Sequence, residues 1–220
     1  VVKFGQSSRL QTNGTLTATG TATDPVVFTS WRDDTAGGDT NNNGNSTGQA
    51  SDWDGIQVSG DTARVSFDRV QVRFGDQMGV STPVPGGVSI LNSVFTDNQY
   101  GGLHVSTTGS TPRVQNNQFH RNGTGYPGLS VNSTAIDLGL LTGNTGSGNG
   151  FDGTMLSGTI TQDGTWPNTP GWPVSIGSGY DPYYNATVTI PADVTVTLQP
   201  GTVVKFGQSS RLQTNGTLTA

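Results

Sequence analysis

The chain has 220 residues, a formal net charge of −5, a sequence pI near 4.6 and only 11% charged residues. Its arginines are dispersed, which disfavours a nucleic-acid-binding groove. No apolar run approaches the ~18 residues that a membrane-spanning helix needs. The lack of cysteine excludes disulfides, thiolate metal sites and cysteine catalysis.

The composition favours an all-β chain. All 15 acidic residues are aspartate, good helix formers are scarce, and Thr, Val, Gly and Asn are abundant. The hydrophobic content of 30% is low for a globular core and suits a thin solenoid with one narrow channel of buried side chains. Glycine has no three-residue period, which excludes a collagen helix, and the missing heptads exclude a coiled coil.

The first predicted element is one coil of alternating strands at residues 7–30. The sequence at the start of the chain is found again at its C-terminal end. Residues 203–220 repeat residues 1–18 without a mismatch, which sets a period of 202 residues. We therefore expect residues 1–202 to be one unit of a longer tandem array, and residues 203–220 to begin the next identical unit.

An insertion at residues 33–52 interrupts the alternating pattern. It contains a D-x-N-x-N-G run, which matches the opening of a calcium-binding loop, where oxygen ligands alternate and glycine makes the bend. The residues that could hold Ca²⁺ are Asp39, Asn41, Asn43, Asp52 and Asp54. Position twelve of this loop is Ala50 rather than a bidentate glutamate, so a solvated Asn/Gly loop is the alternative.

Four segments after the insertion recur at nearly equal intervals, and in each of them two apolar positions keep the same separation. The expected core ladder has one column of Phe67, Ile90, Val114 and Ile136 and a second column of Val72, Phe95, Phe119 and Leu141. The expected turn ladder consists of Asn98, Asn122 and Asn144. Asparagine suits this place because it tolerates left-handed φ and can hydrogen-bond to the next coil.

A second type of strand lies between these segments, usually after a glycine. Its apolar positions recur at similar intervals, at Ile56, Val80, Leu103, Leu129 and Met155. Short strands with this period and with glycine or asparagine at the corners predict a parallel β-helix of about 7–8 coils of 22–26 residues. At the spacing of stacked strands, one 202-residue unit would advance ~35–40 Å along the axis.

These runs carry a family resemblance. The run TVTIPADVTVTLQPGTVVKFGQSSRLQTNGTLTA, continued as TGTATDPVVFTS, resembles the opening of bacterial secreted right-handed parallel β-helix repeat proteins. SDWDGIQVSG followed by VSFDRVQVRFG is similar to their next coils. The resemblance covers nearly the whole chain and implies the fold. It implies no single function, because this architecture is found in polysaccharide lyases and hydrolases, in adhesins and in passive stalks.

The segment 164–185 is rich in proline and aromatic residues. Its aromatic side chains are Trp166, Trp172, Tyr180, Tyr183 and Tyr184. This composition favours an irregular seam where one repeat joins the next, with prolines that limit mispairing of strand edges. Stacking of the aromatic rings on sugars is the alternative.

No grouping of titratable residues indicates catalysis. His104 and His120 fall in different strand types and are expected on different faces, and the aspartates near the turns do not share a column, although glycoside hydrolysis needs two neighbouring carboxylates. Identical copies in series also suit reach and stiffness better than chemistry.

The sequence therefore predicts a structural repeat module of a long extracellular or cell-surface filament, stalk or adhesin. Its expected partners are identical units in series, joined either as a covalent array or by strand exchange between chains. A protein that binds or degrades polysaccharides, with glycans as partners, is the alternative function. Calcium is the only cofactor that the sequence suggests.

Overall fold

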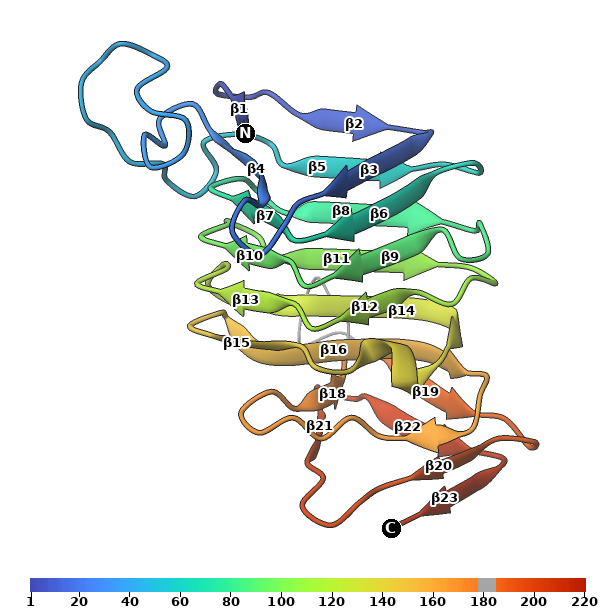
Figure 1. Cartoon of the computed structure of the whole chain (residues 1–220). Coiled ribbons are helices and arrows are strands. Elements are labelled where there is room, and N and C mark those ends of the chain that lie inside the picture. The colour runs from blue at the N-terminus through green and yellow to red at the C-terminus, as the bar shows by residue number, and fades with distance from the viewer. Residues whose placement is uncertain (178–184) are drawn as a thin grey trace.

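The computed structural model describes residues 1–177 and 185–220, which form 23 strands and one short 3-10 helix. Every pairing between the strands of these residues is parallel. Successive coils stack along one axis, with the N-terminus at one end and the C-terminus at the other (Figure 1). The chain is an all-β parallel β-helix, as the sequence predicts.

Three walls surround the core. The first is a six-stranded sheet in the order β1 (Val2–Phe4), β4 (Val26–Ser30), β7 (Val70–Arg73), β10 (Val94–Thr96), β13 (Gln118–His120) and β15 (Thr145–Ser147). The second, ten-stranded sheet follows β2 (Leu10–Thr12), β5 (Ile56–Ser59), β8 (Met78–Thr82), β11 (Leu103–Thr107), β14 (Pro127–Ile136), β16 (Phe151–Ile160), β18 (Val174–Ile176) and β21 (Val204–Phe206), with β19 (Thr187–Ile190) and β22 (Arg211–Thr214) extending from β16.

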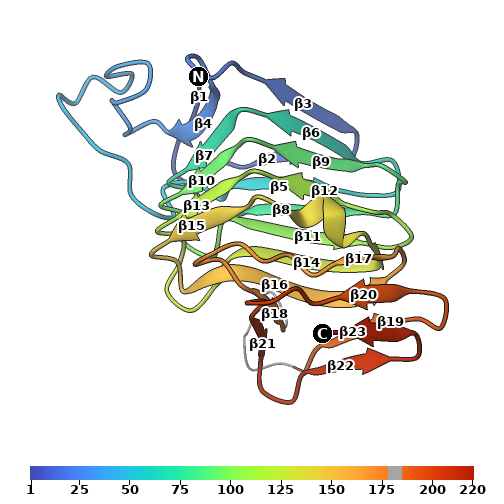
Figure 2. The same cartoon turned by 60° about the horizontal axis from the view of Figure 1, so that its bottom comes forward.

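The third wall is divided along the axis. Its upper part is the four-stranded sheet β12 (Arg113–Gln115), β9 (Val88–Leu91), β6 (Arg64–Asp68) and β3 (Thr15–Thr19), and its lower part is the three-stranded sheet β17 (Gly164–Thr165), β20 (Thr195–Thr197) and β23 (Thr217–Thr219). The 3-10 helix η1 (Leu138–Leu141) packs against both β12 and β17. Figure 2 shows the first and third walls on adjacent sides of the stack.

Side-chain alternation decides which residues enter the core. In β5, β7 and β9 fully buried residues alternate with half-buried ones, as the two-residue period of a strand requires. Because the strands are parallel and in register, Ile90 pairs with Phe67 on one side and with Val114 on the other. Each buried side chain is thereby covered by an equivalent one from the next coil, which a single coil could not supply.

The second core column is aromatic. Phe95 pairs with Val72 and Phe119, and the Phe95 and Phe119 rings stack with centroids 5.2 Å apart and planes 12° apart. Trp172 continues the column, because its ring lies 5.5 Å from that of Phe119 with a 16° angle between the planes. Every side chain of this column is buried, namely those of Val72, Phe95, Phe119 and Trp172.

The last of the four recurring segments differs from the expected register. Ile136 is buried, but it ends β14 and pairs with Ile160 in the second wall, so it does not stand beside Val114. Leu141 is also buried, but it lies in η1 rather than beneath Phe119. The coil that contains these residues is longer than the coils directly before it, and most of its added length lies in the loop between β13 and β14. The assumption of a nearly constant period therefore misplaces both side chains.

Gly146 occupies the place that was expected for Leu141. It pairs with Phe119 in the first wall, and a Cβ atom on Gly146 would lie only 2.7 Å from the ring of Trp172. The indole thus fills the space that a side chain at this position would take. A smaller change affects the second wall, where Met78 rather than Val80 pairs with Ile56.

Two ladders of asparagines turn the corners. In one, Asn98 donates to the side-chain oxygen of Asn122 at 2.9 Å, and Asn122 donates to that of Asn149 at 2.9 Å. In the other, Asn117 donates to Asn144 at 3.1 Å. Asn144, which was expected beneath Asn122, therefore belongs to the second ladder, and Asn149 takes its place in the first.

The corners combine this buried amide with a strained backbone. The residue before each ladder asparagine has left-handed φ, with values of 58° at Asp97, 52° at Arg121 and 57° at Asn116. The amides of Asn98, Asn117 and Asn122 also donate to main-chain carbonyls of the preceding coil. These side chains thus satisfy polar groups that a sharp turn would otherwise leave buried without a partner.

Replacing Phe119 with Ala should destabilise the fold by about 3–5 kcal/mol, because it removes a fully buried ring from between Phe95 and Trp172. Urea unfolding followed by circular dichroism measures the loss. Gln118→Ala is the matched control, since Gln118 is exposed on the same strand. Equal unfolding midpoints for the two variants would contradict the packing of Phe119 in this core column.

Candidate functional site

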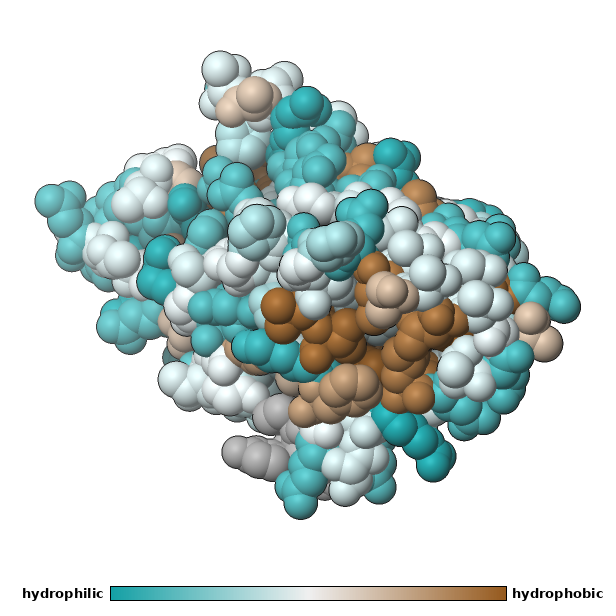
Figure 3. All heavy atoms as spheres, turned by 90° about the horizontal axis from the view of Figure 1, so that it is seen from below, coloured by the Kyte–Doolittle hydropathy of each residue, from teal (hydrophilic) through white to brown (hydrophobic). Residues whose placement is uncertain are grey.

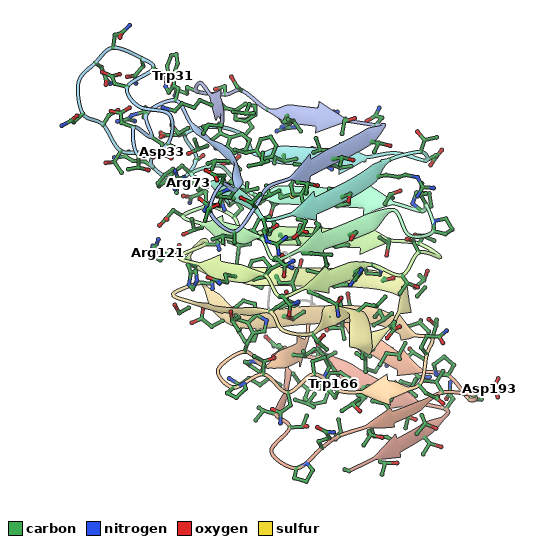
Figure 4. All side chains as sticks on the ribbon, viewed as in Figure 1. Trp31, Asp33, Arg73, Arg121, Trp166 and Asp193 are labelled. Atoms are coloured by element: carbon green, nitrogen blue, oxygen red, sulfur yellow. The ribbon has the colours of Figure 1, made fainter. Side chains whose placement is uncertain are left out.

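The insertion between β4 and β5 projects from the N-terminal end of the stack (Figure 1) and is held at its base by a buried carboxylate. Asp33 is fully buried and accepts hydrogen bonds from the hydroxyls of Thr29 and Thr35, both at 2.6 Å. The Nε atom of Arg73 lies 2.8 Å from the same carboxylate. Figure 4 labels Asp33 and Arg73 where the insertion meets the coils.

The charge of Asp33 is stabilised where it is buried. Burial alone would raise the pKa of this carboxyl, but the hydrogen bonds from Thr29 and Thr35 and the charge of Arg73 outweigh it and lower the pKa below its ordinary value. Asp33 is therefore ionised at neutral pH. It ties the insertion to β7, in the next coil.

The five residues proposed for calcium do not form one site. Asn41, Asn43 and Asp52 line a common hollow of about 380 Å³. Asp39 instead accepts the Gly44 amide at 3.0 Å within its own loop. Asp54 is not among the residues that line this hollow, and its Oδ2 atom lies 3.5 Å from Arg9 Nη2.

Asp52, whose carboxylate lines the hollow, already has partners. It accepts the hydroxyl of Ser30 at 2.7 Å and the amide of Gln49 at 2.8 Å, and the guanidinium of Arg32 lies 3.4 Å away. A neighbouring cation disfavours Ca²⁺. Across residues 1–177 and 185–220, no three His, Cys, Asp or Glu side chains group as metal ligands would.

The hollow has a different chemical character. Trp31 lines it and is 47% exposed, while the side-chain oxygen of Asn41 is buried without a hydrogen-bond partner. The other lining residues are Gln6, Arg32, Asn43, Ser51 and Asp52. A flat aromatic ring beside amide, carboxylate and guanidinium groups can stack on a sugar ring and hydrogen-bond to its hydroxyls.

The two histidines lie in different walls, His104 in β11 and His120 in β13. His104 Nδ1 is 2.5 Å from the Ser130 hydroxyl, and burial lowers its pKa to about 4. His120 Nδ1 is 3.3 Å from the Ser147 hydroxyl. The imidazoles therefore do not contribute to a common site.

The tryptophans expected at the seam are buried in the core. Trp166 is fully buried and Trp172 nearly so, and Trp172 donates from Nε1 to the hydroxyl of Thr154 at 3.0 Å. Both rings are therefore inaccessible to a sugar. The other predicted seam aromatics, Tyr180, Tyr183 and Tyr184, lie outside the described residues.

The duplicated segments form the first and the last coil of the stack (Figure 1). Each copy folds into three strands at corresponding sequence positions, which are β1, β2 and β3 in one and β21, β22 and β23 in the other. The sheets differ in one respect, because β1 begins the first wall whereas β21 ends the second. The first copy pairs with the strands that follow it, β4, β5 and β6. The second pairs with the strands that precede it, β18, β19 and β20. The same coil thus uses opposite edges at the two ends.

The main-chain hydrogen bonds divide in the same way. In the first copy, the oxygens of Ser8 and Gly14 accept amides from the following coil, at 2.8 and 3.0 Å. In the second copy, the amides of Arg211 and Thr217 donate to the preceding coil, at 2.9 and 3.0 Å. These groups occupy different positions of the repeated segment, so one coil can make both sets of bonds.

The last coil also exposes apolar surface. Figure 3 shows hydrophobic side chains gathered across the C-terminal end of the stack, and the large apolar side chains exposed in this coil are Val203, Phe206 and Leu218. An apolar patch of this kind marks a candidate contact surface. Among the described helices, none is long and apolar enough to cross a membrane.

Calcium or EDTA should leave the thermal midpoint unchanged, because Arg32 and two hydrogen-bond donors already occupy Asp52. Differential scanning calorimetry checks this. Asp52→Ala is the positive control and should cost about 1–2 kcal/mol with or without calcium, since it releases these donors. A rise in the thermal midpoint on adding calcium would contradict the claim that the partners of Asp52 keep it from binding Ca²⁺.

Comparison with known proteins bears on the coils themselves. The model of the right-handed beta helix region matches residues 54–166, just over half of the chain. No curated protein and no solved structure matches the chain. The matched residues extend from just before β5 to Trp166 and include most of the stacked coils described above. The chain belongs to the right-handed β-helix family.

Proposed function

We propose that the chain is a structural repeat module of a long extracellular filament, stalk or adhesin. One observation carries the proposal. Two identical coils lie at opposite ends of the stack and use opposite edges. The open edge of each copy is therefore the edge that the other copy fills, so units in series can continue one β-helix.

The function is mechanical. Main-chain hydrogen bonds connect successive coils within the parallel sheets, and the core columns and asparagine ladders extend in the same direction. Such a stack has stabilising contacts only between adjacent coils, so adding units lengthens it without changing its cross-section. The result is a stiff rod whose length scales with the number of units.

An extracellular location is part of this proposal. The absence of cysteine means that the fold needs no disulfides, because stacked coils and buried amide ladders stabilise it instead. The Thr/Asn/Gly-rich, lysine-poor composition resembles that of secreted bacterial fibrous proteins.

A two-unit chain, residues 1–202 followed by residues 1–220, should be longer than the 220-residue chain by ~35–40 Å at unchanged cross-section. Small-angle X-ray scattering measures both quantities. The matched control replaces the coil between the units with a Gly/Ser linker of equal length, which should give two independently moving bodies. If the two chains scatter alike, continuous stacking is refuted.

Polysaccharide binding is a second candidate function, which the exposed ring of Trp31 and the unpartnered oxygen of Asn41 in the insertion hollow favour. Trp31→Ala should then weaken binding of the chain to a neutral polysaccharide, measured by retardation in gels that contain it, by about 5-fold or more, since ring stacking supplies about 1 kcal/mol or more. Tyr100→Ala is the control, because Tyr100 is an exposed aromatic residue elsewhere on the surface. Equal retardation of the two variants would exclude the hollow as a polysaccharide-binding site.

A further inference from the structure

The two copies of one phenylalanine have opposite surroundings. Phe4 stacks on Trp53 with ring centroids 4.3 Å apart and planes 7° apart, and Trp53 is fully buried. Its counterpart Phe206 has identical neighbours in sequence, yet it is 54% exposed in the last coil. The first coil thus shows what covers this ring when another coil follows.

The repeated arginine also makes a different contact in each copy. Arg9 Nη2 lies 3.5 Å from Asp54 Oδ2 in the following coil. Arg211 donates from Nε to the hydroxyl of Thr187 in the preceding coil, at 3.0 Å. Because the two contacts use different nitrogens, one guanidinium can make both at once.

We propose that coil 203–220 is shared by two units, and that a second copy of residues 19–202 docks on its open edge. This inference rests on the proposed function and specifies its joint. Trp53 of the following unit covers Phe206, as Trp53 covers Phe4 within the chain. The guanidinium of Arg211 then bridges Thr187 of one unit and Asp54 of the next.

The apolar core passes through this joint without interruption. Leu212 pairs with Val188 in the preceding coil, and its counterpart Leu10 pairs with Ile56 in the following one. The leucine of β23 has a valine neighbour on one side, and its counterpart in β3 has a valine neighbour on the other. The shared coil therefore places apolar side chains against apolar side chains on both faces, and their burial drives docking.

Amide hydrogen exchange tests the joint without any substitution. The Leu10 amide donates to the carbonyl of Gly55 in the following coil, whereas the equivalent Leu212 amide faces the open end of the 220-residue chain. In the two-unit chain, the amide of the middle copy should exchange at least ~100-fold more slowly than Leu212 does in one unit, and about as slowly as Leu10. The Arg211 amide, bonded to the preceding coil, is the control and should be protected in both chains.

Phenylalanine variants give an independent readout. Phe206→Ala should leave the thermal midpoint of the 220-residue chain nearly unchanged, because the ring is exposed there. The same substitution in the middle copy of the two-unit chain should lower the midpoint by several degrees, as Phe4→Ala should in either chain. Gln213→Ala, an exposed position of the same coil, should have little effect in either chain.

The outcomes separate this joint from the proposed function. A two-unit chain that does not scatter as a rod contradicts continuous stacking itself. The two-unit chain could instead scatter as a rod while the leucine amide of its middle copy still exchanges rapidly and the phenylalanine of that copy can be replaced without lowering the thermal midpoint. That result would contradict the proposal that two units share this coil, and would leave continuous stacking intact. Slow exchange of that amide, together with a lower thermal midpoint when that phenylalanine is replaced, supports both continuous stacking and the shared coil.

Discussion

Each coil of this β-helix can bury its inward side chains only against the coils on either side of it. Phe119 illustrates the constraint, since its faces are covered by Phe95 and Trp172 from neighbouring coils. Any terminal coil therefore leaves one face of its apolar residues uncovered, as Phe206 is in the last coil. A further coil stacked on that end would bury the uncovered face, so the ends of the stack are the surfaces at which units would join.

The corners show how a chain with so few hydrophobic residues sustains a continuous core. Asn98, Asn117 and Asn122 are buried, and each of their amides donates both to the next asparagine and to a main-chain carbonyl. A buried polar network stabilises a fold only when its members are satisfied. Here the ladder satisfies them by repeating the same geometry from coil to coil, so the polar corners and the apolar columns impose the same register.

Sequence periodicity predicted the register where coils are regular and failed where their lengths change. Phe67, Ile90 and Val114 align as expected because the coils that separate them are nearly equal in length. Leu141 and Asn144 follow a longer coil: the paired asparagines Asn117 and Asn144 are 27 residues apart, and most of the added length lies in the loop between β13 and β14. The second asparagine ladder was missed because the equivalent residue in the coil before Asn117 is Ser93, whose amide donates to the Asn117 side chain, so no column of asparagines shows in the sequence.

The predicted calcium site depends on contacts that the sequence does not show. A ligand pattern in sequence does not show which partners its carboxylates already have. Asp52 is taken up by Ser30, Gln49 and Arg32, so the loop uses it to fold. The tryptophans of segment 164–185, for which the composition favoured a seam with sugar stacking as the alternative, are buried in the core. Trp31, an exposed ring that lines the hollow, stands just before the insertion and belongs to no recognisable motif.

The insertion connects the two candidate functions. The ion pair between Asp33 and Arg73 holds it against β7, so in an array the Trp31 hollow would recur once per unit, every ~35–40 Å along a rod. A single hollow of this kind would bind a sugar weakly, but several at fixed spacing could engage one long polysaccharide together, and each further contact would then form at a high effective concentration. Avidity of this kind depends on the geometry of the rod, and it would be lost if the units moved independently. Stiffness at the shared coil and weak binding at the insertion would therefore act as one property of the array.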